Sequence, residues 1–251
     1  MSWAGLLKEQ SRSNLVIIFS GQSILLDVEG TTSSIDFVYD VLFAYAKKHI
    51  ADYLQAHASD PTVSDIAQAL GQEAGITADI CDSEGCTRVV LAAIDLMNND
   101  VKSPPLKSLQ GRIWKSGFQS GQLVSHVFDD VPQSLARWST SGIDIRIYSS
   151  GSVEAQKLFF SHTTAGDLTS HLRGHYDTTT GPKREKESYQ KIAHDIGINP
   201  EGILFLSDVG AELDAARAAG MATGATIRPG NKPLESLYDH DQIDTFSDVT
   251  L

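Results

Sequence analysis

Near its start the chain reads Ile24-Leu25-Leu26-Asp27-Val28-Glu29-Gly30-Thr31-Thr32. An unbroken apolar run leads directly into two acids and a glycine. Apolar runs of this length are typical of strands that are buried on both faces of a parallel sheet. Gly30 permits a sharp turn after such a strand. The segment therefore predicts a buried strand over 24–26 whose carboxyl end presents Asp27.

Three more short apolar runs occur later, the last of them weaker, and helical patterns alternate with them. The runs cover 143–148, 203–206 and 222–227, and the helical patterns cover 131–138, 152–160, 185–196 and 211–219. Strands that alternate with helices favour right-handed crossovers and a sheet covered on both faces. The predicted fold class is therefore α/β, with a doubly wound parallel sheet.

The segment between the first two strands is too long for a single crossover helix. Apolar residues recur there at helical spacing over 37–54, 63–70, 87–97 and 106–118. We therefore expect a helical cap domain at 33–127, inserted into a core domain made of 23–32 and 128–251. Residues 1–22 are left as an N-terminal extension without an assigned role.

The composition limits the classes of partner. The formal net charge is −12, and an acidic surface repels nucleic acid and anionic membranes, so neither is expected as a partner. A phosphorylated substrate would need a local cation and a lysine to reverse this field. The only two cysteines, Cys81 and Cys86, do not form a metal or disulfide pattern, which favours reduced thiols and a cytoplasmic location.

Polar residues follow three of the predicted strands. Ligands of open parallel sheets bind outside the carboxyl ends of the strands, where Asp27, Ser149-Ser150 and Asp208 would meet. The carboxylate of Asp27 can attack phosphorus and form an aspartyl-phosphate. Glu29 can protonate the leaving oxygen and then activate water. Asp27 could instead only cap a turn, but that role would not explain the other residues of the segment.

A metal ion would complete this chemistry. Mg²⁺ is held by one or two carboxylates with water and phosphate oxygens, so Asp208 and Asp27 are candidate ligands. It would neutralise charge on the transferring group. Glu212, one helical turn later, could support the metal, whereas Asp214 fits a solvated helix acid.

The phosphate would need its own binding groups. Ser149 and Ser150 offer hydroxyls and backbone N–H groups at a predicted helix start, which suits a phosphate, although a plain N-cap is the alternative. Lys183 is a candidate point charge for an anionic oxygen. Arg184 and Lys186 lie close by, and charge alone does not choose among the three.

Other conspicuous residues have simpler interpretations. His171 and His175 lack a zinc-site signature and are interpreted as surface histidines. Trp114 and Trp138 fit packing rather than a ligand platform. Asp129-Asp130 is expected in a solvated loop.

Taken together, these motifs resemble the haloacid dehalogenase superfamily, and Glu29 as the second acid is similar to the enolase-phosphatases within it. Further matches to that family are Leu109-Gln110-Gly111 with Ile113-Trp114, Tyr148-Ser149-Ser150-Gly151-Ser152-Val153-Glu154-Ala155-Gln156-Lys157, Glu187-Ser188-Tyr189, Phe205-Leu206-Ser207-Asp208-Val209 and Arg228-Pro229-Gly230-Asn231. The resemblance spans roughly residues 24–249 and selects Lys183 as the motif lysine.

The resemblance implies a reaction. A diketo methylthiopentyl phosphate is enolised and then dephosphorylated to an acireductone in methionine salvage. One Mg²⁺ ion is bound by Asp27, the backbone carbonyl of Glu29, and Asp208, while Ser149, Ser150 and Lys183 contact the substrate. The family suggests a monomer in the cytoplasm, and in the nucleus as well if the source is eukaryotic.

Three alternatives stay open beside this interpretation. The first is a generic Mg²⁺-dependent phosphatase acting on small phosphate esters. The second is a dehalogenase, which uses the same aspartate on carbon without metal, and the third is a silent binding protein with the same fold. The base for enolisation is also open, since Glu29 or a cap residue could serve.

Overall fold

The computed structural model describes residues 16–77, 79–99, 101–232 and 240–251. Residues 1–15 of the expected N-terminal extension lie outside this set. Within the described ranges, no helix is both long and apolar enough to cross a lipid bilayer.

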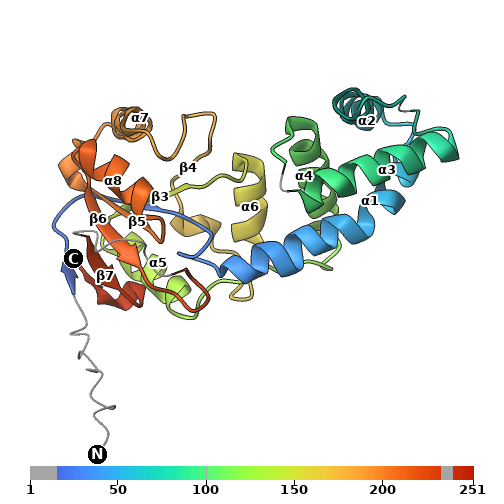
Figure 1. The fold of residues 1–251 in the computed structure, drawn as a ribbon. Helices are drawn as coiled ribbons and strands as arrows, with labels where there is room; N and C mark the ends of the chain where they lie inside the picture. The colour runs from blue at the N-terminus through green and yellow to red at the C-terminus, as the bar shows by residue number, and fades with distance from the viewer. Residues whose placement is uncertain (1–15, 78, 100, 233–239) are drawn as a thin grey trace, which may run out of the picture.

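Parallel strands form the central sheet of the core (Figure 1). In the described part of the chain its order is β4-β3-β2-β5-β6-β7, and each neighbouring pair is parallel. The strands are β2 (Ser23–Leu26), β3 (Asp144–Tyr148), β4 (Gly174–Tyr176), β5 (Ile203–Ser207), β6 (Ala222–Thr226) and β7 (Asp241–Ile243). The predicted α/β class with a parallel sheet is confirmed.

Successive residues of β2 show why the sheet is covered on both faces. Ile24 and Leu26 belong to one buried cluster, whereas Leu25 belongs to another, because side chains alternate along a strand. The first cluster includes α5 (Asp130–Thr140) and α6 (Val153–Ser161), and the second includes α7 (Lys186–Ile196) and α8 (Gly210–Ala218). Ile24, Leu25 and Leu26 are each 0% exposed, so burial on both faces explains the unbroken apolar run.

The short strands were not predicted from the sequence. β4 and β7 have three residues each and contain polar side chains, so neither shows an apolar run. Before β2, β1 (Ile17–Ile18) pairs in parallel with β8 (Val249–Thr250). Ile17 and Phe19 are buried in the core cluster, so part of the segment that had no assigned role completes the core.

The long insertion is helical, and Figure 1 shows it as a lobe beside the sheet. It comprises the π-helical segment η1 (Phe37–Phe43) and the helices α1 (Ala44–Ala56), α2 (Pro61–Ala74), α3 (Ser83–Asn98) and α4 (Pro104–Gln119). These α-helices share a hydrophobic cluster of their own. Trp114 packs at its edge, with its indole N–H donating to the Leu42 carbonyl at 2.8 Å, so the packing interpretation of this residue is confirmed.

Local sequence explains where these helices begin and end. Asp60, Asp82 and Ser103 accept backbone N–H groups at the starts of α2, α3 and α4. α2 ends at Gly75, which has a positive φ of 67°.

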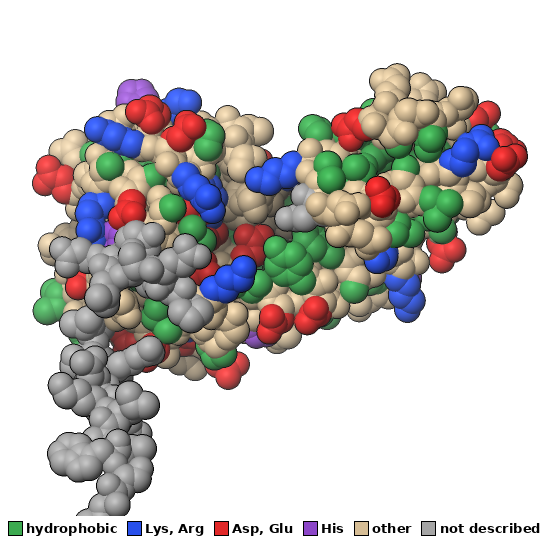
Figure 2. Space-filling model, in the orientation of Figure 1, with side chains coloured by type: hydrophobic (Ala, Val, Ile, Leu, Met, Phe, Trp, Pro, Cys, Tyr) green, Lys and Arg blue, Asp and Glu red, His purple; other side chains and the backbone are tan. Residues whose placement is uncertain are grey.

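The chain enters and leaves the helical lobe at adjacent points. The backbone N–H of Phe128 donates to the Thr32 carbonyl at 3.1 Å. The N–H of Ser34 donates to Nδ1 of His126 at 3.2 Å. Figure 2 shows the surface hollowed between the core and the lobe, with Lys or Arg side chains at its border.

The expectation that Asp129-Asp130 lies in a solvated loop is wrong for Asp130. This residue opens α5, and its carboxylate binds the guanidinium of Arg228 through two contacts of 2.8 and 2.9 Å. Arg228 is 5% exposed and lies over the rings of Phe128 and Phe246. A buried cation needs such a partner, which the sequence alone did not identify because the two residues are far apart in the chain.

We predict that Asp130→Ala lowers the free energy of unfolding by about 3–5 kcal/mol, because it leaves the buried Arg228 without its counter-charge. Urea unfolding followed by circular dichroism measures this. The matched control is Asp129→Ala, an exposed neighbour, which should change stability by about 0.5 kcal/mol or less. Equal effects of the two substitutions would contradict the role given to the ion pair.

Candidate active site

The register of the central strands brings the predicted site residues together. Leu26 of β2 lies beside Ile147 of β3 and Leu206 of β5. Asp27, Ser149 and Asp208 follow these strands and therefore lie at the same edge of the sheet. Sequence spacing alone could not show this, but the expected convergence at the carboxyl ends matches the topology.

Asp27 is held by groups on both of its oxygens. It is 2% exposed, its Oδ1 accepts the N–H of Val28 at 2.7 Å, and its Oδ2 accepts the Ser207 hydroxyl at 3.0 Å. Lys183 Nζ approaches Oδ1 to 2.7 Å. These contacts orient the carboxylate, which a nucleophile requires.

Lys183 lies between two acids. Its Nζ is 2.7 Å from Asp27 Oδ1 and 2.7 Å from Glu212 Oε2, and the residue is 8% exposed. Burial alone would lower the pKa of this ammonium, but the two carboxylates outweigh burial and raise it. Arg184 and Lys186 are exposed, so the buried cation is Lys183.

The loop before α7 fixes the lysine backbone. The Tyr189 hydroxyl donates to the carbonyl of Lys183 at 2.7 Å, and the Tyr148 hydroxyl donates to that of Gly181 at 2.9 Å. Both tyrosine side chains are fully buried in the cluster under α7. The core therefore sets the position from which the lysine reaches Asp27.

Glu212 was expected near the metal at Asp208, but its carboxylate contacts Lys183 and the Ser207 hydroxyl. Burial and the negative charge of Asp27 raise the pKa of Glu212 to about 8, despite the attraction of Lys183. Glu212 is thus linked to Asp27 through Lys183. Asp214, expected as a solvated acid, is half exposed and bonds to His240.

Asp208 lies against the turn that follows β2. A Cβ added to Gly30, whose φ is +70°, would lie 2.3 Å from Asp208 Oδ2, so only glycine fits there. Burial, followed by the negative charge of Asp27, raises the pKa of Asp208 to about 7. Close, buried acids of this kind are stabilised by a cation between them.

The oxygen atoms near Asp208 suit a hard metal ion that needs few protein side chains as ligands. Among the described residues, no three His, Cys, Asp or Glu side chains are arranged as a metal site. Mg²⁺ needs only one or two carboxylates, completed by carbonyl oxygens and water. Asn231 Oδ1 is buried without a hydrogen-bond partner. It lies 2.9 Å from the position that a Cβ would take at Gly30, so it is a further oxygen near Asp208.

The loop after β3 presents one buried and one exposed serine. Ser149 is 2% exposed, and its hydroxyl accepts the N–H of Gly151 at 3.1 Å. Ser150 is exposed, and its carbonyl accepts a hydrogen bond from Lys107 of α4 at 2.7 Å. Ser152 caps α6 through the N–H of Ala155, as predicted.

Glu29 lies two residues after Asp27, on the turn that follows β2. Burial raises the pKa of its carboxyl, and the negative charge of Asp27 adds to this effect. A carboxyl with a raised pKa suits a general acid that later accepts a proton. The sequence singled out Glu29, and Asn231 was noted only as part of a family match without a role. Lys107 was missed, because its distance from the motif along the chain gives no signal.

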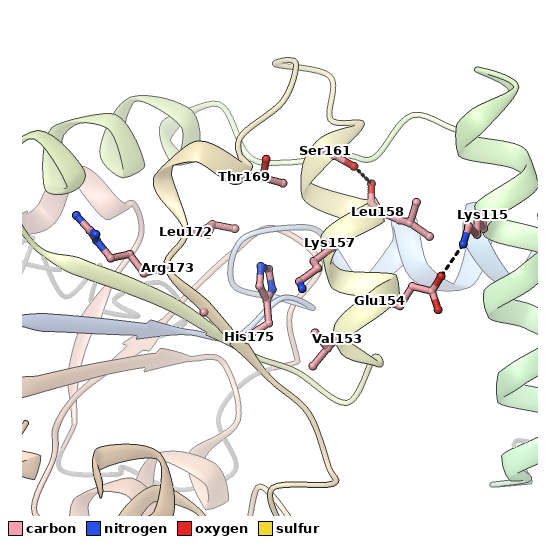
Figure 3. A pocket seen from close by; sticks show the side chains of 11 residues that line it. Lys115, Val153, Glu154, Lys157, Leu158, Ser161, Thr169, Leu172, Arg173 and His175 are labelled. Atoms are coloured by element: carbon pink, nitrogen blue, oxygen red, sulfur yellow. Dashed lines mark hydrogen bonds and ion pairs between the residues drawn. The ribbon is translucent and has the colours of Figure 1, made fainter. Parts of the chain in front are cut away.

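A cavity of about 580 Å³ lies between α4, α6 and β4 (Figure 3). Lys115, Lys157, Arg173 and His175 contribute basic groups to its lining, and Glu154 pairs with Lys115 at 2.9 Å. His175 is partly buried, so the surface interpretation of this histidine is only partly right. Its Nδ1 lies 3.1 Å from Gln156 Oε1.

This environment predicts a pH-dependent stability. Burial, and then the charge of Lys157, lowers the pKa of His175 from 6.5 to about 4. Between these values the unfolded chain binds a proton that the folded chain does not, so stability should fall as pH drops from 6.5 to about 4. Urea unfolding of the wild type and of His175→Gln across this range measures the effect. The variant should lose less stability, and identical pH profiles would refute the assignment.

Comparisons with known proteins agree on one family. The profile of haloacid dehalogenase-like hydrolases matches residues 22–220. The chain is 45% identical over 229 residues to the enolase-phosphatase E1 of Sorangium cellulosum, covering 91% of this chain and 97% of that protein. It is 44% identical over 233 residues to the enolase-phosphatase E1 of Synechococcus elongatus, covering 90% and 97%.

Solved structures give the same picture of the fold. The UTR4 protein of Saccharomyces cerevisiae has a TM-score of 0.76 at 36% identity, covering 90% of this chain and 99% of that one. CbbY of Rhodobacter sphaeroides, in complex with xylulose-(1,5)bisphosphate, has a TM-score of 0.58 at 14% identity, covering 92% of this chain and 100% of that one. At that identity the second likeness concerns the fold alone.

Proposed function

Because this chain belongs to the haloacid dehalogenase-like hydrolases and, within them, to the enolase-phosphatases, we propose that it acts on a 2,3-diketo-5-methylthiopentyl 1-phosphate. It enolises this ester and then hydrolyses it to the acireductone 1,2-dihydroxy-3-keto-5-methylthiopentene and phosphate, a step of methionine salvage. The observation that carries the proposal is the buried Asp27 carboxylate, held by Lys183 and followed by Glu29.

The phosphatase half needs a nucleophile and a proton carrier. An Asp27 oxygen attacks phosphorus while the bond to the leaving oxygen breaks, and Glu29 gives that oxygen its proton. Water then attacks the phosphorus of the aspartyl-phosphate, Glu29 takes a proton from the water, and Asp27 is released. Val28 and Ser207 hold the carboxylate in place during both steps.

The residues around Asp27 would bind the phosphate and one Mg²⁺ ion. Asp27, the backbone carbonyl of Glu29, and Asp208 would hold the ion, which supplies positive charge to the transferring phosphoryl group. Ser149 and Ser150 would bind phosphate oxygens together with Lys183. Lys183 would thereby supply positive charge to an anionic substrate in a chain whose net charge is −12.

The helical insertion at 33–127 would act as a cap over this site. Its α4 contacts the Ser150 loop through Lys107 and α6 through Lys115, which supports a position of the lobe beside the proposed phosphate site. A cap in this place would exclude water from a reactive enol and select the thioether tail. The proposal includes a monomer in the cytoplasm, without nucleic acid or membrane as partners.

We predict that Asp27→Asn lowers phosphate release from the diketo ester roughly a thousandfold or more, since the amide cannot form the aspartyl-phosphate. Colorimetric phosphate detection measures this, and circular dichroism checks the fold. Asp241→Asn is the control, because Asp241 is an exposed acid on β7. Turnover at the wild-type rate in Asp27→Asn would refute covalent catalysis.

A panel of simple sugar phosphates tests the alternative of a generic phosphatase. The wild type should prefer the diketo ester and yield the acireductone. A preference for the sugar phosphates, with no enol formed from the diketo ester, would favour the alternative.

A separate prediction concerns the metal. Asp208→Asn should weaken Mg²⁺ binding roughly 10- to 100-fold, because it removes one of two carboxylates near the ion. Isothermal titration calorimetry measures the affinity, with Asp241→Asn again as the control. Unchanged affinity would remove Asp208 from the ligand set, and full activity after treatment with EDTA would remove the metal from the reaction.

A further inference from the structure

A lysine of the helical lobe reaches the phosphate loop. Lys107 lies near the start of α4, and its Nζ donates a hydrogen bond of 2.7 Å to the carbonyl of Ser150. Lys115 lies about two turns further along the same helix and binds Glu154 of α6 instead. Of these two contacts from α4 to the core, the one made by Lys107 therefore lies at the loop proposed to bind phosphate.

Lys107 is a second lysine at the loop proposed to bind phosphate. Unlike Lys183, it is exposed and has no carboxylate among its described hydrogen-bond and ion-pair partners.

The buried strand closes one side of the proposed phosphate position. Beneath Asp27 the strand is fully buried, with Ile24, Leu25 and Leu26 at 0% exposure. A phosphate bound at Asp27 and the Ser150 loop would therefore direct its carbon chain away from the sheet, and α4 borders that loop through Lys107. Extending the chain along α4 would place the ketone next to the phosphate-bearing carbon beside Lys107.

Enolisation creates charge on that ketone oxygen. A site base takes a proton from the phosphate-bearing carbon, and the electron pair of the broken C–H bond becomes the new C=C bond. The π pair of the ketone moves onto its oxygen, which takes up a proton to give the enol. An ammonium has three N–H donors, and Lys107 uses one of them on Ser150.

We propose that Lys107 is a catalytic residue of the enolisation step, donating a hydrogen bond to the ketone oxygen as negative charge develops on it. A donor aimed at a developing oxyanion stabilises the transition state more than the ground state. The contact with Ser150 holds the ammonium in place beforehand. This inference rests on the proposed enolase-phosphatase function and assigns a group to its first half.

The test separates enolisation from phosphate transfer. The probe is a phosphonate analogue of the diketo ester in which a methylene replaces the ester oxygen, so that enolisation proceeds without hydrolysis. Proton NMR in D₂O follows exchange at the carbon next to the ketone on the phosphonate side. Phosphate release from p-nitrophenyl phosphate, which needs no enolisation, is measured in parallel for the wild type, Lys107→Met, Lys107→Arg and Lys115→Met.

We expect exchange in Lys107→Met to fall roughly 100- to 1,000-fold, while release from p-nitrophenyl phosphate falls far less. Lys107→Arg should recover part of the exchange, because arginine keeps a charged donor. Lys115→Met should resemble the wild type in both assays. Thermal unfolding of each variant checks that the fold is intact.

Two results would overturn the inference while leaving the proposed function in place. One is equal exchange in Lys107→Met and the wild type. The other is a fall of both rates by the same factor, which marks a lysine that only holds the lobe to the loop. If the wild type hydrolyses simple esters but exchanges no proton in the analogue, the enolase-phosphatase proposal fails, and this inference fails with it.

Discussion

The arrangement of the site depends on one buried cation, the Lys183 ammonium between Asp27 and Glu212. Removing charged groups from water is costly, and such clusters persist only when each charge is paired and hydrogen-bonded. The lysine is carried by the loop before α7, and its partners follow β2 and open α8, so the cluster joins three elements far apart in sequence. Replacing buried ionic groups by hydrophobic groups of similar volume often stabilises a protein, so the presence of the cluster is consistent with the catalytic role proposed for it.

Much of this arrangement could be predicted from the sequence, for identifiable physical reasons. Burial on both faces leaves an unbroken apolar run in β2 and β5, and parallel strands place Asp27 and Asp208 at one edge. Charge alone could not choose Lys183. That choice came from the family resemblance, and the burial of Lys183 beside Asp27 agrees with it.

Other features leave no local trace in the sequence. The strands β4 and β7 are too short to show a periodic pattern of apolar residues. From the sequence Asp130 looks like a solvated acid, because its partner Arg228 lies 98 residues later in the chain. The contact of Lys107 with Ser150 depends on how the helical lobe lies against the core, and no spacing of residues encodes that.

The meeting of Thr32 with Phe128, where the chain leaves the core and returns to it, has a consequence for evolution. Because both junctions lie side by side and the helices between them share their own apolar cluster, the insertion behaves as an exchangeable module. Its length and lining can diverge while the chemistry beneath stays the same. Descendants of one ancestral catalyst can thus acquire new selectivities without rebuilding the groups that break the phosphate ester.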